Sequence, residues 1–512
     1  MAGCGLRSHR SAGRTAARRR RADVGTFFNG EVTVEAPAAF SENGGSGVFR
    51  FRRNGTDGAV VVPFTLGGTA VEYADFRELP RSVTIPNGSS AATVEVEGVV
   101  NLASGDRTLT LAASATALFK RAGTGGATAT IRDWTPPAAT AFAKRGNFTV
   151  AGYGEGREAL AGFPVLVRIP AGFVSNPAQM AFYGEDGEFL PFELDTWNPD
   201  GESLAWVGLP ALEQGAVFSL AAGNVGYESP DLAPALWRGA GYVAVLHLGE
   251  DGPDLPGSTV QRIDGTAVLA DGTAAGAANR VAAGAVGAAR LVNEAAGGNK
   301  ARIAVENFER YVADLSSMTI SFWAKHSAAR EPQANERLFG NRSNVSDQAT
   351  GLSAVLLADS TAATPVLDVR GNPTLQNSAG MDQNVKVRPG DGVETSWSDT
   401  WTHLSFSFAA APNPTFFHVA GACAAISNNK QGGATQSTTF AAVLPNGTPF
   451  SFGNSYDEGQ SAIGFKGSID EIRVRNGSVS DDWAFAEEAT VSDPDFLDAT
   501  GALVPGSMIW LF

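Results

Sequence analysis

Cysteine is scarce in this chain of 512 residues, which contains only Cys4 and Cys423. Two cysteines in unrelated contexts exclude a disulfide-rich framework and a cysteine-rich zinc site. The five histidines never stand at metal-ligating spacing in the sequence. A Gly-x-Ser-x-Gly nucleophile elbow and a Gly-rich phosphate loop are also missing. The usual sequence signatures of metalloenzymes, serine hydrolases and nucleotide-binding proteins are therefore absent.

Basic residues and long apolar runs are also in short supply. The chain has 38 Lys and Arg against 53 Asp and Glu, a formal net charge of -15. An acidic surface repels phosphate, so we expect no nucleic-acid partner. No apolar run approaches the ~20 residues that span a bilayer, so no transmembrane segment is predicted.

The N-terminal residues 1–25 are basic and lack the apolar stretch of a secretory signal. Arg18 to Arg21 form an unbroken basic run. Three interpretations stay open: a disordered tail, a misassigned start codon, and a transit-like or nucleic-acid-binding arm. A signal peptide is thus not visible, although the rest of the sequence is typical of an exported protein.

Glycine and proline are abundant, at 60 and 26 residues, and charged residues make up only 18%. This composition favours many short strands joined by turns, which is an all-β fold. The length indicates two to four domains of ~100–200 residues each. We predict sandwich-type units at 26–134, 138–226 and 235–498, and a C-terminal tail at 499–512.

Local patterns support these boundaries. Apolar and polar residues alternate in Val48-Phe49-Arg50-Phe51, which predicts a strand in a sandwich of roughly seven strands. Trp134-Thr135-Pro136-Pro137 then interrupts the pattern, because consecutive prolines cannot continue a sheet ladder. Near the C-terminus, Ser480-Asp481-Asp482-Trp483 predicts the start of a helix that includes 484–489.

The first unit resembles a Calx-beta domain. The resemblance is carried by Ser41-Glu42-Asn43-Gly44, by Gly68 to Phe76, by Val83 to Gly88 and by Thr130-Ile131-Arg132-Asp133. It implies an immunoglobulin-like sandwich with calcium bound by Glu42, Asp75 and Asp133. Calcium prefers six to eight hard oxygen ligands, but Val99-Val100-Asn101 departs from the acidic pattern of the family. The alternative is that Glu42 and Asp75 cap backbone amides in turns.

The second unit is similar to the domain-of-unknown-function family 2341. The residues that carry this are Phe163 to Arg168, Gly187 to Glu193, Trp197-Asn198, Trp206-Val207 and Gly223-Asn224. The resemblance implies a second small β-sandwich without an assigned chemistry. Trp197 is a candidate sugar-stacking ring, and packing in the core is the alternative for such aromatic residues.

The third unit resembles a laminin-G-like, concanavalin-A-like jelly roll. Phe465 to Val474, Thr319 to Trp323 and Trp401 to Ser405 carry the resemblance. It implies two curved antiparallel sheets and binding of carbohydrate, protein or calcium at the rim or the concave face. Asp251 and Asp254, after a predicted first strand, are candidate calcium ligands. Trp397 is a candidate sugar-binding ring, or else it covers the edge of the core.

Catalysis is not expected. Glucanases with this fold need two carboxylates on one face of a strand, ~5 Å apart for a retaining mechanism. Asp470 and Glu471 are adjacent, which would place them on opposite faces, with one of them paired to Arg473 or a neighbouring strand. We therefore predict that the chain is not an enzyme.

Together these patterns predict a secreted or cell-surface binding or adhesion protein. It would recognise a glycan or another surface polymer through the third unit, with calcium as the only candidate cofactor. A purely structural surface protein is the first alternative, and a glycoside hydrolase is the second. Fold resemblance alone does not decide among them, because such sandwiches host many unrelated sites.

Overall fold

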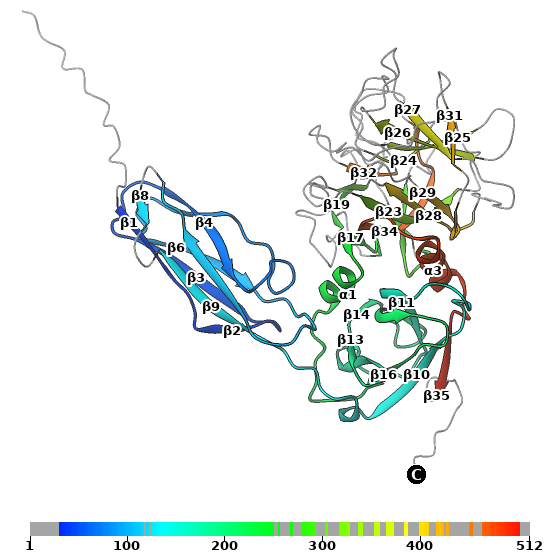
Figure 1. Ribbon diagram of the computed structural model, residues 1–512, viewed down its shortest axis with the longest axis horizontal. Helices are drawn as coiled ribbons and strands as arrows, with labels where there is room; N and C mark the ends of the chain where they lie inside the picture. Colours follow the sequence, from blue (N-terminus) through cyan, green and yellow to red (C-terminus); the bar gives the residue numbers. More distant parts are fainter. Residues whose placement is uncertain are drawn as a thin grey trace, which may run out of the picture.

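The computed structural model describes residues 30–116, 119–121, 125–249 and 463–501, together with shorter segments between them. These segments are 254–255, 267–269, 279–281, 283–292, 303–305, 317–327, 336–340, 353–358, 365–372, 383–387, 399–408, 416–423, 426–429 and 450–453. Nearly all regular structure in them is β-strand, arranged in several antiparallel sheets (Figure 1). The predicted all-β fold class is confirmed.

The first unit is a sandwich of two sheets with strand orders β6-β3-β1-β8 and β2-β9-β7-β4-β5. Its strands are β1 (Gly30–Glu35), β2 (Ala39–Ser41), β3 (Ser46–Arg53), β4 (Val60–Gly68), β5 (Ser82–Ile85), β6 (Ala91–Glu97), β7 (Arg107–Ala113), β8 (Phe119–Arg121) and β9 (Gly126–Arg132). Along β3 every second residue is buried, including Phe49 and Phe51, as the alternating sequence predicts. The described strands number nine rather than about seven, because β2 and β8 are additional three-residue strands that pair in parallel.

The second unit contains a five-stranded sheet, β13-β12-β16-β10-β35, and a three-stranded sheet, β11-β15-β14. Its strands are β10 (Lys144–Val150), β11 (Leu160–Ile169), β12 (Met180–Gly184), β13 (Phe189–Leu190), β14 (Phe192–Thr196), β15 (Ser203–Leu212), β16 (Val217–Ala222) and β35 (Leu497–Gly501). β35 comes from the far end of the chain and pairs antiparallel with β10 (Figure 1). The predicted boundary between 498 and 499 therefore falls inside a strand.

The third unit has an eight-stranded and a ten-stranded sheet among the described residues. The first is formed by β17 (Tyr242–Leu246), β20 (Asn279–Val281), β21 (Ala289–Val292), β23 (Met318–His326), β28 (Thr402–Phe408), β29 (Phe416–Val419), β30 (Ala422–Cys423) and β34 (Gly467–Asn476). The second is formed by β18 (Asp254–Leu255), β19 (Ala267–Leu269), β22 (Ile303–Val305), β24 (Glu336–Gly340), β25 (Ser353–Ala358), β26 (Pro365–Asn372), β27 (Gln383–Val387), β31 (Ile426–Asn429), β32 (Phe450–Phe452) and β33 (Ile463–Gly464).

Two α-helices lie at the junctions between the units. α1 (Ala233–Gly239) begins beside Pro234 and was not predicted, whereas α3 (Asp481–Ser492) confirms the predicted helix. The Ser480 hydroxyl accepts a hydrogen bond from the Trp483 backbone N–H, which is the N-cap that the sequence indicates. None of the helices in the described part of the chain is long and apolar enough to cross a bilayer.

Among the described residues, the two largest buried apolar clusters lie as follows. One lies inside the first unit, around Phe49, Phe51 and Phe64. The other is continuous through the second and third units, where Phe163 packs edge-on against Trp483 of α3 with ring centroids 4.9 Å apart. The first unit therefore has a core of its own, whereas the second and third units share one.

Candidate functional site

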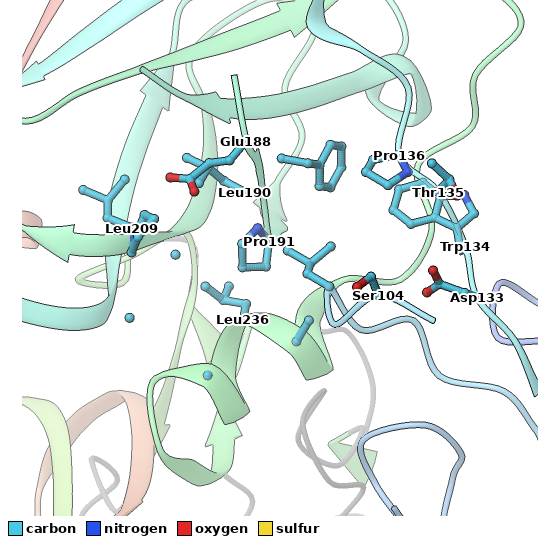
Figure 2. A pocket seen from close by; sticks show the side chains of 17 residues that line it. Ser104, Asp133, Trp134, Thr135, Pro136, Glu188, Leu190, Pro191, Leu209 and Leu236 are labelled. Atoms are coloured by element: carbon cyan, nitrogen blue, oxygen red, sulfur yellow. The ribbon is translucent and has the colours of Figure 1, made fainter. Parts of the chain in front are cut away.

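A groove with a volume of about 520 Å³ lies where the first unit, the second unit and α1 meet. We call it the junction groove. Its lining residues are Leu102, Ser104, Asp133, Trp134, Thr135, Pro136, Gly162, Glu188, Phe189, Leu190, Pro191, Gly208, Leu209, Pro210, Ala235, Leu236 and Gly239. Figure 2 shows Trp134 and Pro136 of the linker on one side, Leu209 on the other, and Pro191 and Leu236 between them.

The Trp134 ring is held at the groove from two directions. Its face meets the edge of Phe189 in β13, with ring centroids 5.4 Å apart and nearly perpendicular planes. Its backbone N–H donates to Glu42 Oε1 in the first unit at 2.9 Å. The linker that the prolines make rigid therefore fixes one aromatic ring between two units, with the ring half-buried rather than sealed in a core.

Polar groups stand at the same groove. Asp133 follows β9 directly, and its carboxylate accepts the Gly105 backbone N–H at 2.9 Å. Glu188 and Ser104 add a second carboxylate and a hydroxyl to the lining. A concave, mostly apolar wall with a few oriented polar groups is the general form of a small-molecule or polymer-segment site.

The predicted calcium positions in the first unit lie beside this groove, but their chemistry does not fit calcium. Glu42 and Asp75 are both buried and are brought together by the Asn101 side-chain amide, which donates to Asp75 Oδ1 at 2.9 Å and to Glu42 Oε2 at 3.3 Å. Arg107 Nε lies 3.9 Å from Asp75 Oδ1. Amide and guanidinium donors thus point at the oxygens that calcium would need as ligands.

Burial raises the pKa of the Glu42 carboxyl to about 7, with the Trp134 hydrogen bond acting against this and the Asp133 and Asp75 charges adding to it. The alternative from the sequence, that these acids accept backbone N–H groups, matches Asp75, which accepts from Val71 N at 2.6 Å.

The other predicted site residues do not join the groove. Trp197 is half-buried and packs against the shared core of the second and third units. Asp254 lies in β18, although its side chain is outside the described residues. Asp251 and Trp397 also lie outside the described residues. Of the predicted positions, only Asp133 lines the junction groove.

The sequence did not predict a buried ionic cluster between the second and third units. His247, just after β17, lies with Nδ1 2.7 Å from Glu471 Oε1 in β34 and 3.3 Å from Asp195 Oδ2 in β14. Its Nε2 lies 3.2 Å from Glu193 Oε2. These four side chains are between 1% and 12% exposed, so the charges are nearly removed from water.

A β-bulge in β34 explains why this cluster was missed. Ser321 and Trp323 of β23 pair with Arg473 and Asp470, so the register slips between them and Glu471 takes a φ of 49°. The expectation that Asp470 and Glu471 point to opposite faces is therefore wrong, because alternation breaks where an extra residue is inserted. The expected pairing with Arg473 is confirmed, since Arg473 Nη2 donates to Glu471 Oε2 at 2.7 Å.

Protonation balances the charges of the cluster. Burial acts to lower the pKa of His247, but Glu471 and Glu193 outweigh it and raise that pKa well above the usual value. Burial raises the pKa of Asp195 to about 6 and raises that of Asp470 well above its usual value. One ligand atom each from Asp195, His247 and Glu471 lie within 4.8 Å of one another, a metal-compatible spacing. The imidazolium supplies the positive charge there, so the cluster acts as an ionic link between two units.

Comparison with known proteins gives distant likenesses only. The chain matches no protein-family model. It also matches none of the curated proteins. Among solved structures, it is similar to a CBM40 module of a sialidase from Ruminococcus gnavus bound to α2,3-sialyllactose, with 14% identity, TM-score 0.28, and coverage of 37% of this chain and 92% of that one.

Two further solved structures are also similar to parts of this chain. The Calx CBD1 domain in its apo form shares 21% identity at TM-score 0.19 and covers 21% of this chain and 99% of its own. Domain 4 of an extracellular arabinanase from Geobacillus stearothermophilus, in complex with arabinotriose, shares 18% identity at TM-score 0.30, covering 48% and 96%. The family resemblances stated for the three units therefore stay predictions.

Proposed function

We propose that this chain is a non-catalytic binding protein for carbohydrate or another surface polymer, and that it works outside the cell or at the cell surface. The observation that carries the proposal is the junction groove, in which a fixed, half-buried Trp134 ring stands opposite an apolar wall and beside two carboxylates. The proposal places binding at this groove. The prediction that the third unit binds ligand through Trp397 stays a separate prediction.

The groove suits a saccharide segment because sugars have apolar C–H faces and polar hydroxyl edges. An indole ring and aliphatic side chains can cover the C–H face, and carboxylates accept hydroxyl protons. Asp133 is held in place by its bond to Gly105, so it is preorganised to accept such a bond with its remaining lone pairs. The volume of about 520 Å³ is within the usual range for ligand sites.

A binding role rather than a catalytic one is supported by where the acids lie. The carboxylates that converge closely, Asp195, Glu471 and Asp470, are in the buried ionic cluster and do not line the junction groove. They are occupied by His247, Arg473 and backbone N–H groups. A hydrolase would need two acids that face the same bond of the substrate, whereas the two acids that line the groove, Asp133 and Glu188, lie on opposite sides of Pro191 (Figure 2).

Binding of the full chain to a polysaccharide panel tests this proposal. We expect at least one polymer to bind, and we expect Trp134→Ala to weaken that binding about tenfold or more while the thermal unfolding midpoint stays close to that of the wild type. Trp197→Ala is the matched control, because Trp197 is a half-buried ring of the second unit outside the groove. Unchanged affinity in Trp134→Ala, or no binding to any polymer, would contradict the proposal.

A further inference from the structure

A second cavity, of about 430 Å³, adjoins the junction groove and shares Leu102, Pro191, Ala235 and Gly239 with it. We call it the Arg238 pocket. It is bounded by the first unit on one side and by α1 on the other, and two guanidinium groups, those of Arg107 and Arg238, line it. A chain of ligand units lying in the junction groove would therefore extend past these cations.

The guanidinium of Arg107 already has acceptors within the protein. Its Nη1 donates to the Ser104 and Gly105 carbonyls at 3.2 and 2.7 Å, and its Nε lies 3.9 Å from Asp75. Asp75 in turn accepts the Val71 backbone N–H at 2.6 Å and the Asn101 amide at 2.9 Å. These groups satisfy one another and leave little capacity for a ligand.

The guanidinium of Arg238 has no comparable hydrogen-bond partners among the described residues. It forms no hydrogen bond or ion pair with a residue in the described part of the chain, and its Nη1 is buried without a partner. Its one close neighbour is the Tyr73 ring, whose centroid lies 5.6 Å from the guanidinium carbon. Burial lowers the pKa of Arg238, with Tyr73 and Asp75 acting against that shift. A guanidinium keeps its charge in proteins, so the buried Nη1 donor has no protein acceptor among the described residues.

The wall facing Arg238 is strained. Tyr73 has a φ of 67°, in the left-handed region that residues with a side chain rarely adopt. Its backbone N–H donates to the Phe76 carbonyl at 2.7 Å, and the turn holds the ring beside Arg238. Strain of this kind persists where the surrounding structure imposes it, and such positions are frequent at ligand sites.

We propose that Arg238 binds the carboxylate of an acidic sugar unit, so that the polymer recognised is a uronate-containing polysaccharide. This rests on the proposed function, because it names the ligand class of the same groove. The guanidinium fork matches a carboxylate with two parallel hydrogen bonds, and the adjoining Tyr73 ring offers a face for the sugar C–H groups. An unsatisfied, half-buried arginine beside a ligand groove is the observation that points to an anionic group.

The net charge of -15 favours a carboxylate over a sulfate. A densely sulfated polymer would be repelled by this chain over a Debye length of about 8 Å at physiological salt. A uronate polymer carries at most one charge per sugar unit, and it can still make the short-range contact at Arg238. We therefore expect specificity to come from contact rather than from long-range attraction.

The test compares polymers that differ only in charge. Polygalacturonate, alginate and hyaluronan would each be offered to the full chain as the free acid and as the methyl ester, together with neutral dextran and dextran sulfate. We expect one or more free acids to bind at least about tenfold more tightly than the matching ester, and Arg238→Gln to abolish that preference. Arg50→Gln, an exposed arginine on β3 outside both cavities, should keep it.

The outcomes separate this inference from the proposed function. Neutral polymers or esters that bind as tightly as the acids, with no effect of Arg238→Gln, would overturn the inference and leave the function standing. Binding to dextran sulfate in place of uronates would also overturn it. Binding to no polymer at all would overturn both. If Arg238→Gln lowers the unfolding midpoint, Arg238→Lys keeps the charge without the fork, and a preference unchanged from wild type would contradict bidentate binding.

Discussion

At the scale of single residues, charges that enter the interior are matched in different ways. Arg53 ends the alternating strand β3 with its side chain inside the first unit, where it is 5% exposed. Its guanidinium donates to the backbone carbonyls of Thr56, Asp57, Pro86 and Ser89 at 2.8 to 3.0 Å. Arg238, by contrast, has no such acceptors, and that contrast makes it a ligand-binding candidate.

Glu42 gives a prediction about pH. Its folded-state pKa is raised from 4.5 to about 7, so its contribution to stability is complete below pH 4.5 and is lost as the pH rises through 7. The first unit should therefore lose about 2.5 kcal/mol of unfolding free energy from this group between pH 5 and pH 8. Denaturant unfolding of wild type and Glu42→Gln at both pH values measures this effect.

The Gln variant is the matched control, because it keeps an oxygen that accepts the Trp134 backbone N–H and carries no titratable proton. The difference in stability between the two proteins should grow in favour of the variant as the pH rises. A difference that stays constant from pH 5 to pH 8 would show that Glu42 titrates normally.

The ligand-binding aromatic residues can be predicted from sequence only if it is known which rings line a groove. The sequence pattern indicates Trp197 and Trp397 as candidate binding rings, and it indicates Trp134 only as part of a linker. Trp134 stands at the groove because Phe189 and Glu42, from two different units, fix it there. Contacts between units leave no local pattern, so this part of the site was not predictable from residue spacing.

At the scale of elements, the alternation of apolar and polar residues predicts a strand correctly, and the N-cap residue predicts a helix correctly. The period of two located β3, and the Ser480 cap located α3. β35 was missed because its partner β10 is distant in the sequence and its five residues have no apolar alternation. α1 was missed because a seven-residue helix depends on packing rather than on its own propensity.

The bulge in β34 gives a prediction about two adjacent acids. Glu471→Gln removes the charge that His247 and Arg473 share, and it leaves Arg473 buried without its counter-ion, so it should cost about 3–5 kcal/mol of stability. Asp470→Asn should cost much less, about 1–2 kcal/mol, because burial already raises the pKa of Asp470 well above its usual value and the asparagine oxygen can still accept one of the two backbone N–H groups.

Denaturant unfolding of the two variants at pH 7 measures this contrast, with the folded state checked by near-ultraviolet circular dichroism. Equal losses in both variants would mean that Glu471 and Asp470 have the same protonation state. A larger loss in Asp470→Asn would reverse the assignment of charge within the cluster.

At the scale of the whole molecule, one apolar cluster of the described residues joins the second unit to the third. Phe163, Trp206, Trp237 and Trp483 belong to one continuous core through the second and third units, and His247 adds an ionic link between them. The first unit contacts the rest through Val100, which belongs to the same cluster, and through Arg77 Nη2, which lies 3.3 Å from Asp231 Oδ2. Predicting three units from sequence was reasonable, but sharing of a core is not visible in local patterns.

Calorimetric unfolding should therefore show two transitions. A fragment of residues 26–134 should reproduce one of them, and the second and third units should unfold together in the other. Millimolar calcium should shift neither, because the acids at the predicted ligand positions of the first unit face donors. Three resolved transitions, or a calcium-dependent rise in the midpoint of the fragment, would contradict this account.

Binding of a polysaccharide at the junction groove is tested most directly by hydrogen–deuterium exchange of the full chain with and without the bound polymer. We predict that binding slows exchange in the segments that meet at the junction groove, which are 102–105, 133–135, 188–190 and 235–239. Protection confined to the third unit around Trp397, with exchange at the groove unchanged, would contradict it.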